Sequence, residues 1–543
     1  MYNKSMHIRR DACCFFFVSG VLCLLISLPY LWAAQAAGQD YFFGGMLFNP
    51  MDGNSYLAKM YQGWQGNWQF RLPFTADPGE GAYLFLYYLL LGHLARLGGL
   101  SLLLTFHLAR LGGSLLMLLA LWRFYTRVLS APNLYRLAFA LSVIGSGLGW
   151  LAISFGIFTS DLWVAEAYPF LSAYANPHFP LGLALLVWLL TPQRETDRLI
   201  GEHLSGHNFQ YSRIYAMIDF LAALALGIVM PFGVGVVVLV LGGVMVWEIL
   251  GKQLMVRGSM AIASLWHSFT SRKLFLVIIG GVTVLIYDLW VTATNPVLKG
   301  WHEQNLTPSP PLWDFLLSFA PFLILALPGA WSAWRSQRAQ QHVLLVWSTV
   351  GVLLLYLPFG LQRRFMFGLA IPLAGLATLG LQALVRRNER RTFAIIICLF
   401  LLVLPTNLVV LLTSAHGVLT HAPSLYLGQG EAQAMGWLAR NTPEEAVILA
   451  ATDTGLFIPA QTGRRVVYGH PFETLAAREH AAQVNRLFQG TATHEDFEVL
   501  HEVDYVFVGP RERAWGEAPF TRGMAVVYQA GGVTVYRVGE GDQ

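Results

Sequence analysis

Long apolar stretches alternate with short polar connections up to about residue 420. Crossing a bilayer as a helix takes about 20 apolar residues. Windows of that kind begin near residues 13, 82, 100, 134, 177, 215, 232, 274, 313, 342, 364 and 392. The stretch between Ala82 and Trp122 is an exception, because it contains two short helices broken by RLGGLS yet must cross an odd number of times. Three explanations stay open: one of the two helices is tilted, is re-entrant, or is followed by an exterior basic loop. The pattern predicts an α-helical polytopic membrane protein.

The basic residues predict how the chain is oriented. They gather in the connections at 9–10, 123–136, 194–213, 252–273, 335–338 and 386–391. Basic connections favour the cytoplasm. The opposite side then holds 37–81, 159–176, 295–312 and the chain after about 414. A cytoplasmic N-terminus and an extracytoplasmic C-terminus require an odd number of spans, and we expect about 11 to 13.

After about Ser424 the composition becomes that of a soluble domain. Helical periodicity in GEAQAMGWLARNTPEE is followed by the buried strands AVILAA and DYVFVGP and by the hairpin AVVYQAGGVTVYRV. Two more helices are expected at AAREHAAQVNRLFQG and HEDFEVLHEV. We therefore expect a membrane module over 1–423 and a small extracytoplasmic α/β domain over 424–543.

Composition supports a membrane protein and excludes other classes. Of 543 residues, 55% are hydrophobic and 12% are charged, whereas soluble chains carry about 25% charged residues. The four cysteines lie in apolar runs, which argues against a disulfide framework or a cysteine zinc site. The net charge of +4 is spread over loops, so no nucleic-acid partner is expected. The first apolar run lacks a small-residue cleavage site and is expected to be a retained span.

The segment NPMDGNSYLAKMYQGWQGNW, residues 49–68, follows the first apolar stretch. Its apolar residues fall on one helical face, and the other face carries polar residues, namely Asn54, Ser55, Lys59 and Gln62. A helix of this kind that contains Trp and Tyr lies flat in the membrane interface. Asp52 stands at its start. From the local sequence alone Asp52 is an N-cap, since Asp, Asn and Ser are preferred there.

The order of these features resembles the GT-C superfamily of membrane glycosyltransferases, which includes protein O-mannosyltransferases and the lipid A aminoarabinose transferase. A first span leads into an exterior loop, 37–81, with Asp52, with Tyr56 four residues later, and with an interfacial helix; further spans and an exterior domain follow. The resemblance implies a catalytic aspartate in this loop and a donor sugar linked to polyprenyl phosphate. The acceptor is a lipid, a glycan or a protein, and the location is a bacterial-type inner membrane. Many members have an Asp-Glu pair at this point, whereas this chain has Asp52-Gly53.

The chemistry of such a transfer gives Asp52 a role. A base must take the proton of an acceptor hydroxyl as its oxygen attacks the anomeric carbon. A carboxylate at the boundary of lipid and water can meet a soluble acceptor and a lipid-borne donor. A single attack with the lipid phosphate leaving inverts the anomeric configuration. We therefore predict that Asp52 is the general base.

The second exterior loop, TSDLWVAEAYPFLSAYANPHFPLG, contains further polar candidates, namely Asp161, Glu166 and His178. Carboxylate and imidazole ligands suit Mg²⁺ or Mn²⁺ holding a leaving phosphate. Glu166 and His178 are thus candidate metal ligands together with Asp52, and His178 is also a candidate contact of the phosphate. The alternative is a solvated loop in which His178 caps the next span.

Arg363 and Arg364 fall in a tight connection that the charge pattern places outside. Ionisable groups in such places are functional candidates, and guanidinium groups bind phosphate in bidentate fashion. We therefore assign both to the donor phosphate. The alternative is that they reach the lipid headgroups of the outer leaflet.

Weaker candidates for substrate binding lie in two other exterior segments. NPVLKGWHEQNLTPSPP contains Trp301, whose indole face suits a sugar ring, although interfacial Trp is common in membrane proteins. GRRVVYGHPFETLAAREH places His470 and Glu473 after a strand and resembles a GH…ET stretch of bacterial GT-C-like proteins. These two residues are either on the acceptor side or part of a strand-to-helix turn, with Glu473 in the first helical turn.

Three classes of function remain open. The polar clusters lie in exterior loops and no inverted repeat is visible, which favours a glycosyltransferase over a transporter of lipid-linked saccharides. The missing Glu after Asp52 keeps a third alternative, a non-catalytic GT-C-like scaffold.

Overall fold

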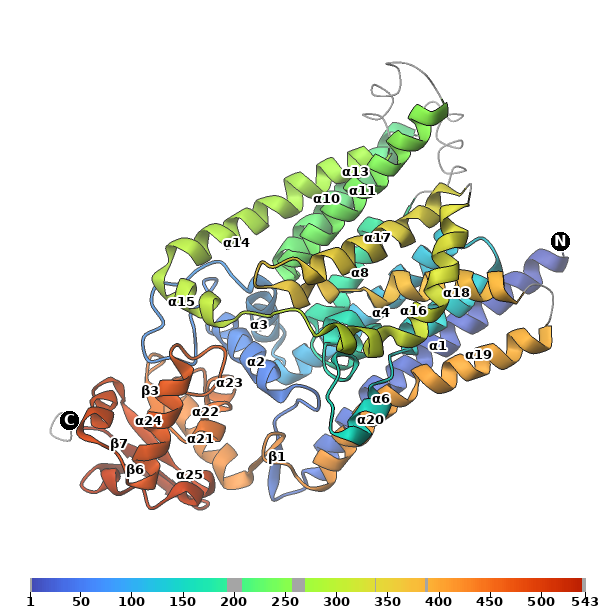
Figure 1. The fold of residues 1–543 in the computed structure, drawn as a ribbon. Coiled ribbons are helices and arrows are strands. Elements are labelled where there is room, and N and C mark those ends of the chain that lie inside the picture. Colours follow the sequence, from blue (N-terminus) through green and yellow to red (C-terminus); the bar gives the residue numbers. More distant parts are fainter. Residues whose placement is uncertain (1, 193–207, 256–268, 337, 386–388, 540–543) are drawn as a thin grey trace. The chain divides into compact units, whose positions relative to one another are not determined.

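The computed structural model describes residues 2–192, 208–255, 269–336, 338–385 and 389–539 (Figure 1). The basic connections predicted at 194–213, 252–273, 335–338 and 386–391 lie wholly or partly outside the described residues. The chain divides into two compact units, each described by itself. Unit 1 is Met1–Ser27, Arg110–Asp288 and Thr307–Leu412, and unit 2 is Leu28–Ala109, Leu289–Leu306 and Thr413–Gln543. The domain boundary predicted at 424 stays a prediction.

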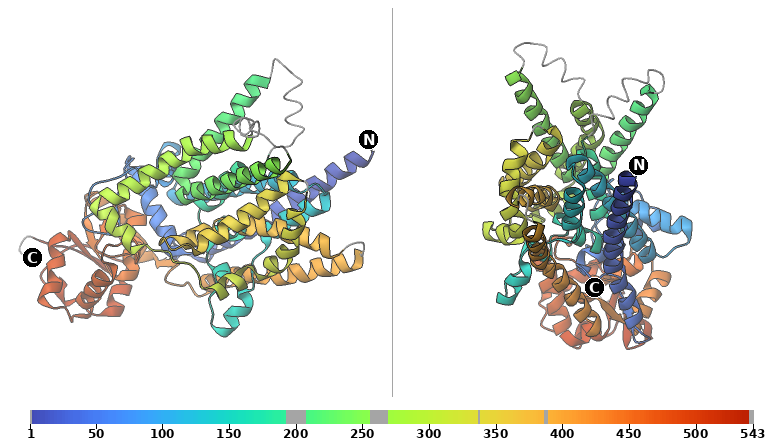
Figure 2. Two further views of the ribbon diagram at one scale, coloured as in Figure 1. Left: turned by 45° about the horizontal axis from the view of Figure 1, so that its top comes forward. Right: turned by 90° about the vertical axis from the view of Figure 1, so that its right-hand side faces the viewer.

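Unit 1 is helical. Its α-helices are α5 (Pro132–Ile144), α6 (Gly149–Ala152), α7 (Pro169–Tyr174), α8 (His178–Leu190), α10 (Asn208–Val229), α11 (Pro231–Met255), α13 (Phe269–Val277), α16 (Leu312–Trp334), α17 (Ala339–Tyr356), α18 (Ala370–Leu384) and α19 (Glu389–Val403). Short 3₁₀ or π turns are η1 (Ile153–Phe155), η2 (Ser160–Leu162), η3 (Ala165–Ala167), η4 (Ile278–Val282) and η5 (Gln362–Met366). The chain passes between the units within α1 (Tyr2–Ala36), α4 (Leu102–Val128), α14 (Thr283–Thr294) and α20 (Pro405–Leu419), and once between Leu306 and Thr307. Helices α10, α11 and α13 pack side by side (Figure 1; Figure 2).

Eight helices among the described residues are long and apolar enough to cross a membrane, judged by length and composition. They are Arg9–Ala36, Leu102–Val128, Pro132–Phe155, Pro231–Leu250, Thr270–Thr294, Leu312–Trp334, Ala339–Tyr356 and Arg390–Leu419. Two shorter apolar helices are His178–Leu190 and Ala370–Leu384. The chain is an integral multi-pass membrane protein, as predicted, and the count of 11 to 13 spans stays a prediction.

The apolar window at residue 82 does not form a spanning helix. Helix α3 (Leu86–Gly98) has 13 residues and is about 20 Å long, whereas the hydrocarbon core is about 30 Å thick. It packs instead on α2 (Pro50–Gln65), through glycines on both helices. A Cβ on Gly92 would lie 1.9 Å from a carbonyl oxygen of α2, and one on Gly63 would lie 2.1 Å from a carbonyl oxygen of α3. Of the helices in this stretch, only α4 is long enough to cross.

The C-terminal part of unit 2 contains a mixed sheet. The short strands β1 (Tyr41–Phe43) and β2 (Tyr426–Gly428) pair antiparallel elsewhere in the unit. The five-stranded sheet has the order β4 (Arg465–Val466), β3 (Val447–Leu449), β5 (Tyr505–Val508), β7 (Val533–Arg537) and β6 (Ala525–Ala530). Strand β3 is parallel to β4 and β5, whereas β7 is antiparallel to β5 and β6. The helices of unit 2 outside the sheet's strands are α2, α3, α15 (Pro296–Gln304), α21 (Gln429–Asn441), α22 (Thr452–Gly455), α23 (Ile458–Thr462), α24 (Ala477–Gln489), η6 (His494–Glu502), α25 (Pro510–Trp515) and η7 (Pro519–Thr521).

Helices cover both faces of this sheet (Figure 1; Figure 2). Successive side chains of a strand point to opposite faces, so Ile448 packs with α21 while Val447 and Leu449 pack with α24. This explains why the strand is apolar without alternation. The predicted hairpin is confirmed, with Gly531 and Gly532 at positive φ in its turn. The segment HEDFEVLHEV forms a 3₁₀ helix.

Candidate functional site

Asp52 lies in the first turn of α2 and is not its N-cap. The helix follows Asn49, whose φ is 47°, and no side chain caps it. Instead Asn49 Nδ2 donates to Asp52 Oδ2 at 2.5 Å, and Asp52 Oδ1 lies 3.8 Å from His470 Nε2. The Asp52 side chain is 39% exposed. The capping interpretation is therefore wrong, and the carboxylate is accessible.

The polar face of α2 is buried. Lys59 is fully buried, and its Nζ lies 2.6 Å from Glu473 Oε1 and 2.5 Å from Ser55 Oγ. The Ser55 hydroxyl also donates to Glu473 Oε1 at 2.5 Å. Burial favours the neutral acid, but the charge of Lys59 and the hydrogen bonds from Lys59 and Ser55 outweigh it and hold the pKa of Glu473 below its ordinary value. The ion pair fastens the loop that carries Glu473 to α2.

His470 is buried beneath Asp52. Its Nδ1 accepts hydrogen bonds from the backbone N–H groups of Phe472 at 3.1 Å and Glu473 at 3.2 Å. Burial lowers the pKa of His470, the carboxylates of Glu473 and Asp52 oppose this, and Lys59 lowers it further. The net direction is downward, so the ring is neutral near pH 7.

Helix α15 packs against the same loop. Gln304 Nε2 donates to the carbonyl oxygens of Thr474 at 2.7 Å and Phe472 at 3.2 Å. Trp301 lies with its ring centroid 5.9 Å from that of Phe85, and Lys59 Nζ lies 4.5 Å from the same Phe85 ring. The segment NPVLKGWHEQNLTPSPP is thus a helix over part of its length, and Trp301, His470 and Glu473 belong to one cluster of unit 2.

Tyr56 is the neighbour of this cluster on α2. Its ring stacks on Tyr88 of α3, with centroids 4.3 Å apart, and Lys59 Nζ lies 5.2 Å from the Tyr56 centroid. The Asp-x-x-x-Tyr spacing therefore places Tyr56 beside the buried lysine.

The other predicted residues belong to unit 1. Arg364 Nη1 lies 3.6 Å from Glu166 Oε1, in a pair in which the Glu166 side chain is 6% exposed and that of Arg364 is 37% exposed. The Arg363 guanidinium lies 4.4 Å from the ring centroid of Trp163. Gly368 N–H donates to the Glu166 carbonyl oxygen at 2.9 Å. The two connections that carry these residues therefore meet at one end of unit 1, as expected if both lie on one side of the membrane.

Asp161 and His178 have structural surroundings. The Asp161 carboxylate accepts from the Thr159 hydroxyl at 2.7 Å and from Gly149 N–H at 2.8 Å. Burial raises the pKa of Asp161. His178 is buried and is the first residue of α8. The loop is therefore not solvated around these two residues.

The predicted metal ligands do not fit a metal centre. In the part of the chain that the structure describes, no three His, Cys, Asp or Glu side chains form a group that could hold a metal ion. Glu166 pairs with Arg364, and Asp52 has an amide and an imidazole beside it. We therefore derive no step through Mg²⁺ or Mn²⁺.

Packing explains why Gly53 follows Asp52. Gly53 is buried, and a Cβ there would lie 2.5 Å from Cγ and 2.6 Å from Sδ of Met46. Met46 is itself 1% exposed. The space that the second acid of an Asp-Glu pair would need is filled by this methionine.

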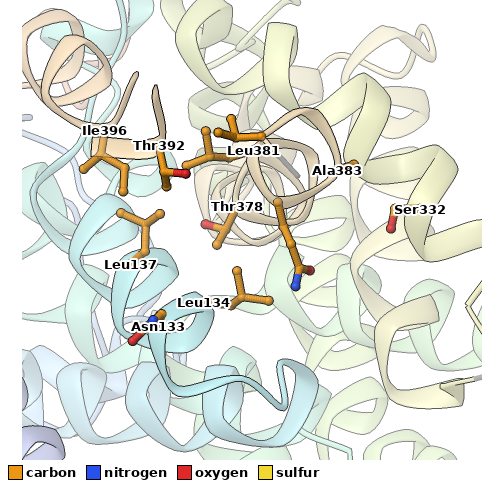
Figure 3. A pocket seen from close by; sticks show the side chains of 11 residues that line it. Asn133, Leu134, Leu137, Ser332, Thr378, Leu381, Ala383, Thr392 and Ile396 are labelled. Carbon is orange, nitrogen blue, oxygen red and sulfur yellow. The ribbon is translucent and has the colours of Figure 1, made fainter. Parts of the chain in front are cut away.

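Sequence reasoning missed two members of these clusters. Lys59 was visible as the one cation on the polar face of α2, and Trp163 as an aromatic residue of the second exterior loop. The sequence does not show that Lys59 pairs with Glu473 or that Trp163 lies against Arg363. A separate cavity of about 590 Å³ in unit 1, lined by α5, α16, α18 and α19, contains none of the predicted residues (Figure 3).

Comparisons with known proteins support the fold. Neither a protein-family model nor a curated protein sequence matches the chain. The oligosaccharyltransferase AglB from Archaeoglobus fulgidus, solved with an inhibitory peptide and a dolichol-phosphate, is similar with a TM-score of 0.54 and 13% identity over 100% of this chain and 75% of that chain. A structure of the Archaeoglobus fulgidus enzyme with Zn and sulfate is similar with a TM-score of 0.55 and 14% identity, over 96% of this chain and 73% of that chain. ArnT from Cupriavidus metallidurans, in the apo state, has a TM-score of 0.47 and 13% identity, over 95% of this chain and 97% of that chain. The likeness to the two Archaeoglobus fulgidus structures confirms the predicted fold.

Proposed function

We propose that this chain, which has the fold of GT-C membrane glycosyltransferases, moves a sugar from a polyprenyl-phosphate donor to an acceptor hydroxyl. The observation that carries the proposal is the environment of Asp52. Its carboxylate is partly exposed beside a buried cluster of Lys59, Glu473 and His470, in the first turn of α2. This is the position at which members of the superfamily have a catalytic aspartate.

In the proposed reaction Asp52 takes the proton of the acceptor hydroxyl. The acceptor oxygen forms a bond to the anomeric carbon as the bond from that carbon to the lipid phosphate oxygen breaks. The lipid phosphate leaves with the electron pair, and the anomeric configuration inverts. Asp52 is accessible enough to meet an acceptor, since 39% of its side chain is exposed.

Arg363, Arg364 and His178 are proposed to hold the donor phosphate. The Arg364 side chain is 37% exposed, which leaves part of the guanidinium accessible beside Glu166 at 3.6 Å. Guanidinium groups prefer phosphate in bidentate geometry. That the archaeal neighbour was solved with a dolichol-phosphate supports a lipid phosphate as the leaving group here.

Tyr56, Trp301, His470 and Glu473 are proposed to lie on the acceptor side. The Trp301 indole Nε1 is buried and has no hydrogen-bond partner among the described residues, so an acceptor oxygen is a suitable partner. A lipid, a glycan or a protein hydroxyl would each satisfy it. The orientation that we propose places this cluster and the C-terminal region on the extracytoplasmic side of a bacterial-type inner membrane.

The test is transfer in proteoliposomes with a synthetic polyprenyl-phosphate sugar and a panel of hydroxyl acceptors. We expect a glycosylated product with inverted configuration, and we expect Asp52→Asn to abolish it while leaving the protein folded. Movement of the lipid-linked sugar across the bilayer without transfer would instead identify a transporter. Neither activity, with lipid binding retained, would identify a scaffold.

A further inference from the structure

We propose that His470 is the positioning residue of Asp52, acting through a ring N–H whose location the backbone fixes. The inference rests on the proposed function, because it assigns a role next to the proposed base. It goes beyond that function because a residue of the C-terminal region is proposed to orient the carboxylate of Asp52.

The backbone determines which ring nitrogen carries the proton. Phe472 N–H and Glu473 N–H both donate to Nδ1, and a nitrogen that accepts hydrogen bonds has no hydrogen of its own. The neutral ring of His470 therefore carries its proton on Nε2. A charged ring would turn an Nδ1 hydrogen toward two backbone donors, so the loop excludes the imidazolium.

The ring is also held in place. The backbone N–H groups of Gly469 and His470 donate to Thr474 Oγ1 at 3.3 Å each. Gly469 packs against another backbone, since a Cβ there would lie 2.3 Å from the carbonyl oxygen of Gly455. The Phe74 ring centroid lies 5.4 Å from that of His470, whose residue is 1% exposed. The direction of the Nε2–H bond is therefore set by the fold.

This N–H lacks a hydrogen-bond partner. Nε2 is buried and has none among the described residues. Lys59 and Glu473 are the other charged groups near the ring, and they neutralise each other at 2.6 Å. Asp52 Oδ1, at 3.8 Å, is the carboxylate oxygen within ion-pair distance of Nε2 in the part of the chain that the structure describes.

A separation of 3.8 Å is too long for a hydrogen bond, which needs about 3 Å. A small rotation of the Asp52 side chain closes it, because that side chain is partly exposed and its other oxygen contacts Asn49. With Oδ1 bound to His470, the plane of the carboxylate is fixed. The base then presents its free lone pairs in one direction, and a fixed direction is what proton transfer from a bound hydroxyl requires.

Two substitutions separate this role from a structural one. His470→Asn keeps an acceptor at the Nδ1 position, and Asn is well suited to accept from the N–H groups two and three residues later, but it has no group at the Nε2 position. His470→Gln keeps a donor that reaches the Nε2 position and loses the acceptor for the loop. His494→Asn, at an exposed histidine of the same C-terminal region, is the matched control.

If His470 positions Asp52, His470→Asn lowers kcat about 10- to 100-fold with KM within about twofold of the wild type, and His470→Gln restores most of kcat. The thermal unfolding of His470→Asn should match that of the wild type. If His470 only supports its loop, the order reverses: His470→Asn keeps kcat, and His470→Gln loses stability and activity together. That reversal overturns the inference.

A spectroscopic measurement keeps the inference testable without turnover. In protein labelled with ¹⁵N-histidine, the His470 signal is identified by its loss in His470→Asn. We expect an unprotonated Nδ1 and a protonated Nε2 whose proton shift changes in Asp52→Asn. A proton on Nδ1, or an Nε2 signal insensitive to Asp52→Asn, overturns the inference even if transfer is confirmed. If Asp52→Asn leaves turnover intact while the Nε2 signal responds, it is the proposed function that fails.

Discussion

The buried ion pair of Lys59 and Glu473 determines how firmly the loop of His470 is held on α2. Replacing Lys59 by Met removes the ammonium and leaves the Glu473 carboxylate in a buried site, with the Ser55 hydroxyl as its remaining side-chain donor. Glu473 lies 414 residues away along the chain, so this contact joins segments that the sequence does not link. We predict that Lys59→Met loosens the loop selectively.

The magnitude follows from the geometry. At 2.6 Å two unit charges attract by about 6 kcal/mol at an effective dielectric constant of about 20. The cost of removing both charges from water offsets part of this, and removing one partner of a buried pair costs about 3–5 kcal/mol. At about 1.4 kcal/mol for each factor of ten, the opening equilibrium of the loop should rise by about two to three and a half orders of magnitude.

Hydrogen–deuterium exchange of the purified protein measures this opening. Peptides that cover α2 and residues 468–476 should lose protection in Lys59→Met, and peptides of the sheet should not. Lys299→Met is the matched control, because its partner Glu303 is 4.0 Å away and both side chains are more than half exposed; exposed pairs contribute about 0–1 kcal/mol. The double variant Lys59→Met with Glu473→Gln should regain protection, since no charge is then left buried alone. Equal protection in Lys59→Met and Lys299→Met would refute the reasoning.

Further predictions concern the donor site, the pH dependence and the packing around Asp52. Arg364→Ala should raise the apparent KM for the donor about tenfold and leave that for the acceptor unchanged, as measured in the transfer assay; an unchanged donor KM would remove the phosphate assignment. His470 has a folded pKa below its ordinary 6.5, so the unfolded chain binds more protons and stability should fall as the pH drops below about 6.5. Glu473, with a folded pKa below its ordinary 4.5, adds stability above about pH 4.5 that is lost below it. Melting temperatures measured between pH 8 and pH 3 should therefore fall in two stages, and the first should be absent in His470→Asn. Gly53→Glu should lower the melting temperature because Met46 fills the space, and adding Met46→Ala should recover part of the loss; no loss in the single variant would contradict the packing argument.

The elements that the sequence predicted correctly are those whose pattern depends on local burial. Helix α2 follows from the spacing of its apolar residues, and the hairpin of β6 and β7 follows from its Gly-Gly turn. The stretch from Ala82 to Trp122, where the sequence leaves open which of two helices crosses, is explained by tertiary packing. The apolar residues of α3 are as dense as those of a span, but the helix ends after 13 residues and packs on α2. Hydropathy does not distinguish a helix buried against protein from a helix buried in lipid.

The residue types of the candidate site were predictable from the sequence, but the contacts between these residues were not. Asp52, His470 and Glu473 were each recognisable as polar residues beside apolar elements. That Lys59 of α2 pairs with Glu473 and lies over the ring of Phe85 depends on tertiary contacts. A lysine on the polar face of an amphipathic helix is normally solvated, and only the fold shows it to be fully buried.

The C-terminal region of unit 2 contributes contacts to the surroundings of Asp52. Composition separates a soluble region after about Ser424, yet the contacts of that region reach α2 through Glu473 and α15 through the carbonyl oxygen of Thr474. Without Glu473 the ammonium of Lys59 would be buried unpaired in a ring of aromatic side chains, which proteins avoid. The segment 37–81 therefore requires the C-terminal region to form the surroundings of Asp52. That region neutralises the charge of Lys59 through Glu473 and places the ring of His470 3.8 Å from the proposed base.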